Sequence, residues 1–103
     1  MIEVPVRIHA SVDISRAPDI IEDVCASDGL QISMKTTLSK YPGSVHWHFK
    51  RPNERGTLEI TLIEKERRMF LAIQAGRSAM WVEKCIPGLK EKLEQRFDMR
   101  SRK

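Results

Sequence analysis

Strict alternation of apolar and polar residues opens the chain and predicts a first strand over residues 2–12. Its apolar positions share one parity and are Ile2, Val4, Val6, Ile8, Ala10 and Val12. A period of two with β-branched residues is typical of a strand with one buried face. Arg7 and His9 then lie on the polar face. Pro5 cannot donate to a ladder, which favours a position at the sheet edge.

Apolar residues at helical spacing predict two helices. The first follows Asp13 or Ser15 as a capping residue and stops at Gly29. The second begins near Ser78. Its apolar stripe comprises Val82, Cys85, Ile86, Leu89, Leu93 and Phe97. Pro87 interrupts this stripe and predicts a kink or a break, because proline removes a helical hydrogen bond.

Four further alternating segments lie between the helices and are joined by short turns. They cover residues 30–38, 44–50, 56–63 and 69–76. The element order is therefore β-α-β-β-β-β-α, which predicts a single α+β domain over residues 1–103. We expect a five-stranded, mainly antiparallel sheet ordered 2-3-4-5-1, with both helices packed on one face. The last residues, about 100–103, are expected to fray.

Side-chain parity predicts the pairing of the strand "SVHWHFK" with its neighbours. Pairing Lys50 with Thr57 makes every inward pair with the next strand apolar: Phe49–Leu58, Trp47–Ile60 and Val45–Leu62. On the face opposite the helices, called the outer face, His48 then meets Glu59 and His46 meets Thr61. The preceding hairpin is expected to pair Leu38–Val45, Thr36–Trp47 and Met34–Phe49. This pairing places Lys35 beside His48 on the outer face.

The row Lys35–His48–Glu59 has two interpretations. It is either a solvated ladder of charges or a titratable binding site. A metal site needs at least three converging ligands. His9 would lie three strands, about 14 Å, from the histidine strand. Glu59 could join the two histidines, but no cysteine or aspartate completes a site. An HxH pair alone is a weak signal, and so no metal and no cofactor are expected.

Composition and charge narrow the class of protein. The chain has 103 residues, 41% apolar and 31% charged, with no run long enough to span a membrane and no secretory signal pattern. The two cysteines, Cys25 and Cys85, lie on helical stripes and indicate buried thiols in a cytoplasmic protein; a disulfide between them is the alternative. Residues 84–103 hold seven bases and three acids, so they carry the whole net charge of +4.

No arrangement of residues indicates catalysis, and so a non-catalytic interaction protein is the first hypothesis. Phe70 is expected on the outer face, where it could pack against another protein or a second copy of the chain, unless a helix or the sheet twist covers it. The alternative is nucleic-acid binding. It would use Arg7, Lys35, His46 and Lys50 with the basic helix and tail, which comprise Lys90, Lys92, Arg96, Arg100 and Arg102. A third hypothesis is a small-ligand pocket near Trp47 and Trp81.

Two resemblances accompany this interpretation. The element order, with two helices on one face, resembles the half-repeat of the TATA-box-binding protein family over most of the chain. The outer residues expected here are more polar than the apolar DNA-reading face of that family. The segments "HWHFK" and "GTLEIT" resemble a group of short bacterial proteins, which implies a domain that stands alone.

Overall fold

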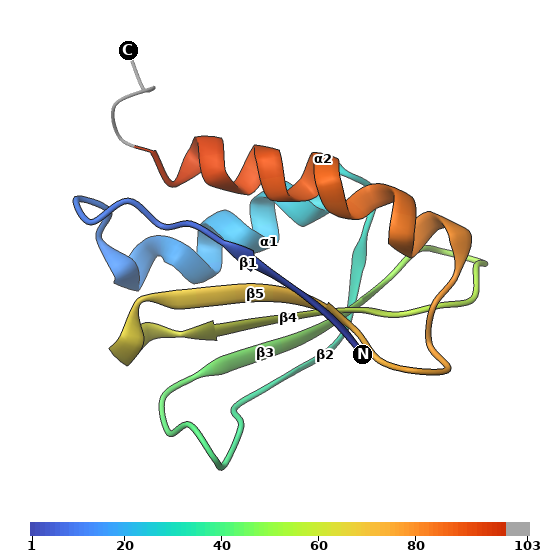
Figure 1. Ribbon diagram of the computed structural model, residues 1–103, viewed down its shortest axis with the longest axis horizontal. Helices are drawn as coiled ribbons and strands as arrows, with labels where there is room; N and C mark the ends of the chain where they lie inside the picture. Colours follow the sequence, from blue (N-terminus) through green and yellow to red (C-terminus); the bar gives the residue numbers. More distant parts are fainter. Residues whose placement is uncertain (99–103) are drawn as a thin grey trace.

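Five strands form one antiparallel sheet, and two helices cover one of its faces in the computed structural model (Figure 1). The strands are β1 (Ile2–Val6), β2 (Gln31–Thr36), β3 (Val45–Lys50), β4 (Leu58–Ile63) and β5 (Arg68–Ile73). The helices are α1 (Ala17–Ser27) and α2 (Met80–Arg96), and short 3-10 turns are η1 (Ile14–Arg16) and η2 (Glu64–Glu66). The sheet order β1-β5-β4-β3-β2 and the α+β class confirm the prediction. The structure describes residues 1–98, so Arg100, Arg102 and the predicted frayed end lie outside the described residues.

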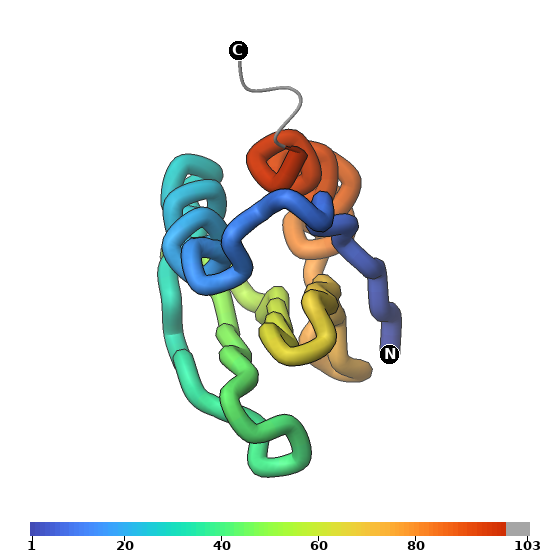
Figure 2. Tube along the Cα trace, turned by 90° about the vertical axis from the view of Figure 1, so that its left-hand side faces the viewer, coloured from blue at the N-terminus to red at the C-terminus, as the bar shows by residue number. Residues whose placement is uncertain are grey.

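The core lies between the sheet and the two helices. Figure 2 shows the two helices side by side over the sheet. Trp47 and Phe49 of β3 are 0% and 1% exposed, as the parity of the strand predicted. They pack in one buried cluster with the inward residues of β4 and β5 and with the apolar stripes of both helices. The central strand β4 is buried along its whole length, on the outer face as well as the inner face.

The pairing of β3 with β4 is the one that parity predicted. Val45, Trp47 and Phe49 face Leu62, Ile60 and Leu58, while His46 and His48 face Thr61 and Glu59. A slip of one residue would turn every apolar side chain of the pair to the other face. This register brings both histidines and Glu59 to the outer face.

The pairing of β2 with β3 corrects the sequence prediction. The register shifts between Ile32 and Met34, so that Lys35 pairs with Trp47 and Met34 pairs with His48. The extra residue of a bulge reverses the parity of the strand beyond it. Lys35 therefore lies on the helix side, where its Nζ is 2.6 Å from Glu22 Oε2 of α1. The predicted Lys35–His48–Glu59 row is wrong, and Met34 takes the place of Lys35.

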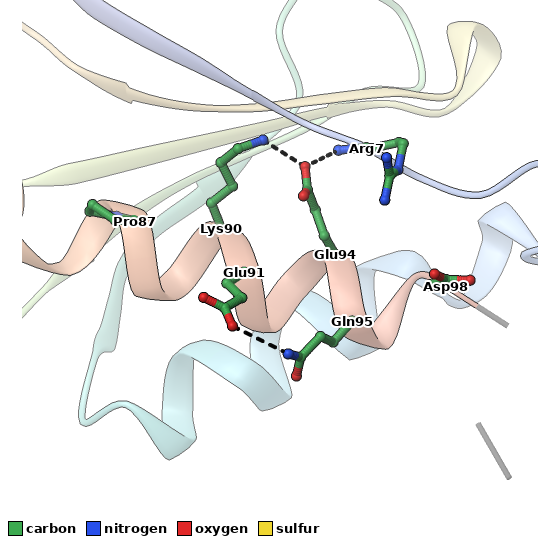
Figure 3. A pocket seen from close by; sticks show the side chains of 7 residues that line it. All are labelled: Arg7, Pro87, Lys90, Glu91, Glu94, Gln95 and Asp98. Carbon is green, nitrogen blue, oxygen red and sulfur yellow. Dashed lines mark hydrogen bonds and ion pairs between the residues drawn. The ribbon is translucent and has the colours of Figure 1, made fainter. Parts of the chain in front are cut away.

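The first strand is shorter than predicted, because the backbone after Val6 forms hydrogen bonds with residues at the end of α2 instead of continuing along β5. The backbone N–H of Arg7 donates to Glu94 Oε2 at 2.9 Å, and the N–H of His9 donates to the Phe97 carbonyl at 3.1 Å. Figure 3 shows Arg7 beside α2, where Glu94 also pairs with Lys90. Neither Arg7 nor His9 lies on the outer face of the sheet, which corrects both placements.

The helix ends agree with the predictions in part. Gly29 stops the first helical segment with a φ of +81°, as expected. Ser78 does not cap α2: the N-cap residue is Ala79, and Ser78 Oγ donates to Glu83 Oε2 instead. Of the kink or break predicted at Pro87, the break does not occur, since α2 runs through this residue and loses only one backbone donor. Within residues 1–98, no helix combines the length and apolar character needed to cross a membrane.

Gly56, just before β4, provides a test of the packing between the sheet and α2. Its φ is +102°, and a Cβ there would lie 2.7 Å from Ala79 Cβ and 2.9 Å from Val82 Cγ2. Gly43 also has a positive φ, of +84°, but has open space around it. We expect Gly56→Ala to lower the free energy of unfolding by about 1–3 kcal/mol more than Gly43→Ala, because overpacking adds to backbone strain. Urea unfolding of both variants measures this difference, and equal losses would contradict the close approach of α2.

Candidate metal centre

Two histidines and a glutamate meet on the outer face at the middle of the β3–β4 pair. His46 and His48 alternate to this face of β3, and Glu59 projects from β4 opposite His48. All three are shielded from solvent, with side-chain exposures of 11%, 17% and 5%. A carboxylate is seldom buried to this extent unless it is paired or binds a metal. His48 and Glu59, which the sequence left as part of either a solvated ladder or a binding site, therefore form a partly buried polar cluster with His46.

The ligand-type atoms of this cluster converge. His46 Nε2 and His48 Nε2 are 3.2 Å apart. Glu59 Oε1 lies 3.4 Å from His46 Nε2, and Glu59 Oε2 lies 3.7 Å from His48 Nε2. The two imidazole rings meet edge to face, at an interplanar angle of 74°. This edge-on contact lets both Nε2 atoms point toward the same carboxylate.

Residues from the loop after β5 close the cluster on its remaining side. Gln74 Nε2 donates to Glu59 Oε1 at 3.4 Å, and Arg77 Nη1 lies 3.6 Å from Glu59 Oε2. The loop is anchored by the N–H of Thr57, which donates to the Arg77 carbonyl at 2.9 Å. Glu59 thus has two imidazoles, one amide and one guanidinium around it. Its contacts are all 3.4 Å or longer, which is loose for hydrogen bonds to a carboxylate.

His46 is held in one orientation by a second contact. Its Nδ1 is 2.8 Å from Thr61 Oγ1, the residue directly opposite on β4. Burial lowers the pKa of His46, with His48 acting in the same direction and Glu59 against it. With Nδ1–H donated to the threonine, the lone pair of Nε2 points into the cluster. A hydrogen bond of this kind to the distal ring nitrogen is what orients histidine ligands in metal sites.

The spacing of the donor atoms matches a tetrahedral site. Ligands about 2.1 Å from zinc at tetrahedral angles lie about 3.4 Å from one another. The separations found here are 3.2 Å between the two imidazole nitrogens, and 3.4 and 3.7 Å from these nitrogens to the two oxygens of Glu59. A single ion can therefore bind between the three side chains with only small rotations. Within residues 1–98, this is the only group of three such side chains with converging ligand atoms.

A basic pocket of about 500 Å³ adjoins the cluster and shares His48 and Arg77 with it. The other residues that line it are Ser33, Lys50, Arg55, Gly56, Thr57 and Gly76. Lys50 Nζ donates to the Gly56 carbonyl at 3.2 Å. Arg55 has no ion pair with any residue of the described chain. Three cationic side chains therefore lie beside His48, and two of them, Lys50 and Arg55, have no acidic partner among residues 1–98.

Several other residues predicted as part of a site lie elsewhere or have other partners. Phe70 is on the outer face as predicted, opposite Thr61, but it is half-buried and the Arg68 guanidinium lies 5.5 Å from its ring centroid. The basic side chains of α2 are paired with acids. These pairs are Lys90 with Glu94, Lys92 with Asp28, and Arg96 with Asp23. The structure brings His46, His48, Glu59 and Lys50 together and separates the rest.

The hollows beside α2 differ from the small-ligand pocket that the sequence suggested. Trp47 is fully buried in the core and lines none of the described pockets. Trp81 borders a surface hollow of about 570 Å³ with Arg51 and Cys85, and its indole donates to the Arg55 carbonyl. A second hollow, shown in Figure 3, lies between Arg7 and α2 and measures about 260 Å³. The space between Trp47 and Trp81 is filled by core side chains.

Sequence reasoning missed Gln74 and Arg77. Gln74 could have been found by extending the alternation of β5, because it follows Ala72 by two residues and Ala72 pairs with Glu59. Arg77 could not have been found in this way, since it lies beyond the strand. Its position depends on the hydrogen bond between the loop after β5 and Thr57. Ser33 of the basic pocket is the bulge residue, which alternation alone does not reveal.

Cys25 and Cys85 are free thiols in the structure. Cys25 is fully buried in α1, as predicted, while Cys85 is half-buried. Burial raises the pKa of Cys25 to about 12, and Asp28 acts in the same direction. Burial also raises the pKa of Cys85. Both thiols are therefore protonated near neutral pH and are poor nucleophiles and metal ligands.

The raised pKa of Cys25 predicts a loss of stability in alkali. The folded state keeps the thiol proton that the unfolded state releases above the ordinary pKa of 9.0, so stability falls between that pH and about 12. The loss approaches about 1.4 kcal/mol per pH unit for one proton. Urea unfolding across this range should show a steeper decline for the wild type than for Cys25→Ala. Parallel declines would show that Cys25 does not contribute.

Comparison of the chain with protein-family models, curated proteins and solved structures finds no match. The case for a function therefore comes from the residues and their geometry.

Proposed function

We propose that this protein binds a divalent metal ion of the zinc type through His46, His48 and Glu59. The observation that carries the proposal is the convergence of two imidazole nitrogens, 3.2 Å apart, on the two oxygens of the Glu59 carboxylate, at 3.4 and 3.7 Å. This spacing is what a tetrahedral ion about 2.1 Å from each ligand requires. The sequence led to the opposite expectation, because no cysteine or aspartate completed a set with His46, His48 and Glu59, and the burial of Glu59 was not visible in it.

The donor set favours zinc over calcium or magnesium. Two imidazoles and one carboxylate are typical of sites for zinc and neighbouring transition metals, whereas calcium and magnesium prefer oxygen ligands. Three protein ligands leave a fourth tetrahedral position for water or another molecule. Thr61 behind His46 supplies the outer contact that such sites use to orient the ring. We therefore expect an ion with one open coordination position, rather than a structural ion whose four ligands all come from the protein.

Zinc titration monitored by isothermal calorimetry tests the proposal. The wild-type protein should bind one zinc ion per chain. His48→Ala should weaken the affinity by about a hundredfold or more, since it removes one of three ligands. The matched control is His9→Ala, because His9 lies in the loop after β1 and bonds Ser11 rather than the cluster. Equal affinity in wild type and His48→Ala would refute the site.

An interaction with a second copy of the chain is a second candidate, and the structure favours the β2 edge for it. Every residue of β2 is exposed, and Ile32 and Met34 are 45% and 39% exposed. An edge strand with exposed apolar residues offers free backbone groups for pairing. The outer face is less suitable, because its centre is polar and Arg68 covers Phe70. The free thiols of Cys25 and Cys85 support the proposed cytoplasmic location.

Sedimentation at micromolar concentration tests the edge interaction. The wild type should form dimers, and Ile32→Lys should shift the equilibrium to monomers because a charged edge residue opposes strand pairing. Ile2→Lys is the matched control, since Ile2 is 51% exposed on the opposite edge of the sheet. A wild-type protein that stays monomeric would rule out this candidate.

Nucleic-acid binding has less support in the structure than in the sequence. Of its proposed contacts, Arg7 lies beside α2 and Lys35 pairs with Glu22 on the helix side. The three bases of α2 named above are ion-paired. Of these proposed contacts within residues 1–98, only His46 and Lys50 lie on the outer face.

A further inference from the structure

We propose that the basic pocket beside the metal centre binds a phosphate monoester, one oxygen of which takes the open position on the metal. This inference rests on the proposed metal site, because the metal supplies one of the ligand's contacts. The pocket and the centre share His48 and Arg77, so a molecule in the pocket lies next to the cluster. Its volume of about 500 Å³ falls in the range of small-molecule sites.

The charge of the pocket indicates an anion. Lys50, Arg55 and Arg77 all line it, and of these three only Arg77 is paired with an acid, Glu59, among residues 1–98. The Arg77 side chain is 50% exposed, and its guanidinium comes no closer than 3.6 Å to Glu59. It therefore retains donors for a ligand. Arg55 is exposed and has no acidic partner within residues 1–98. The site thus holds more positive charge than its own acid can balance.

The number of donors favours phosphate over a carboxylate. A phosphate monoester carries a charge of about −1.5 to −2 at neutral pH and presents three terminal oxygens. One oxygen can bind the metal while the other two accept from the guanidinium groups and the Lys50 ammonium. A carboxylate has two oxygens and a single charge, so it would leave cationic donors unsatisfied.

The hydrogen bonds of His48 couple the two sites. Arg77 Nη1 lies 3.5 Å from His48 Nδ1, and His48 Nε2 lies 3.2 Å from His46 Nε2. This pattern needs the proton of His48 on Nε2. Metal binding needs the Nε2 lone pair, which moves the proton to Nδ1, where it opposes the donor of Arg77. Arg77 then loses its contact with His48 and keeps the 3.6 Å contact with Glu59, so its remaining donors can turn to an anion in the pocket.

The test measures binding of phenyl phosphate by calorimetry to the zinc-loaded and the metal-free protein. Phenyl phosphate should bind the zinc-loaded protein at least about tenfold more tightly, and benzoate should bind it about tenfold more weakly than phenyl phosphate. Arg55→Gln should weaken phenyl phosphate binding by about tenfold, the loss of one charge-assisted hydrogen bond. Lys65→Gln is the matched control, because Lys65 is exposed in η2 at the far end of β4.

The outcomes separate this inference from the metal proposal. Zinc binding without phenyl phosphate binding at millimolar concentration would overturn the inference and leave the metal site intact. Equal phenyl phosphate affinity with and without zinc would refute the coupling through His48. Equal weakening by Arg55→Gln and Lys65→Gln would show a general effect of charge and would also overturn the site.

Discussion

Replacing Trp47 with alanine will lower the free energy of unfolding by about 3–5 kcal/mol, the usual cost of removing a large aromatic side chain from a core. Trp47 is fully buried and stacks on Phe49 at a centroid distance of 6.4 Å. Its indole N–H donates to Glu22 Oε2 at 2.9 Å, so the substitution also removes a contact between β3 and α1. Cavity formation and the lost hydrogen bond act together.

The conservative variant Trp47→Phe separates these contributions. It keeps most of the apolar volume but removes the indole donor, so we expect a loss of about 1–2 kcal/mol. Urea unfolding monitored by circular dichroism measures both variants. A loss below about 1 kcal/mol for Trp47→Ala would contradict the central position of this residue in the core.

Zinc will raise the thermal unfolding midpoint of the wild type, and Glu59→Gln will abolish most of that rise. Free zinc a hundredfold above Kd stabilises the folded state by about 2.7 kcal/mol, which corresponds to about 10–20 °C for a chain of this size. Glutamine keeps the shape of Glu59 but removes the only anionic ligand of the cluster. We therefore expect its zinc affinity to fall by about a hundredfold.

The control for this prediction is Glu3→Gln. Glu3 lies on β1 in the same outer row, because it and Glu59 both pair with Ala72, but it is exposed and outside the cluster. Scanning calorimetry with and without zinc should show the full rise in this variant. A zinc-dependent rise of equal size in Glu59→Gln and Glu3→Gln would place the ion elsewhere.

The elements and the central register could be predicted from the sequence, because burial on one face enforces period two. Val45, Trp47 and Phe49 can pair with Leu62, Ile60 and Leu58 in only one way that keeps apolar residues together. That pairing also predicted that His48 faces Glu59. Parity alone therefore predicts that His46, His48 and Glu59 share the outer face.

The remaining features depend on interactions that no local pattern encodes. The bulge at Ser33 reverses the parity of β2 and moves Lys35 to the helix side, where it forms an ion pair with Glu22. The strand that begins the chain ends at Val6, because Glu94 and Phe97 of α2 accept the next backbone donors. Arg77 reaches Glu59 only through the loop anchored at Thr57. These are long-range contacts, and they decide which polar residues meet.

The burial of Glu59 is the feature that most changed the interpretation of the histidine strand. As an exposed residue it would make a weak cross-strand pair with His48. With its side chain 5% exposed and surrounded by His46, His48, Gln74 and Arg77, it is the third donor of a converging set. Neighbouring side chains of β3, β5 and the loop after β5 cover β4, and this cover is not visible in the alternation of any one strand.

X-ray absorption spectroscopy at the zinc edge of the zinc-loaded protein identifies the atoms that bind the ion. We expect a first shell of nitrogen and oxygen at about 2.0–2.1 Å with outer scattering from two imidazole rings. Because Cys25 and Cys85 lie in the helices and not in the cluster, no sulfur should be present. A shell containing sulfur at about 2.3 Å, or scattering from fewer than two imidazoles, would contradict binding by His46, His48 and Glu59.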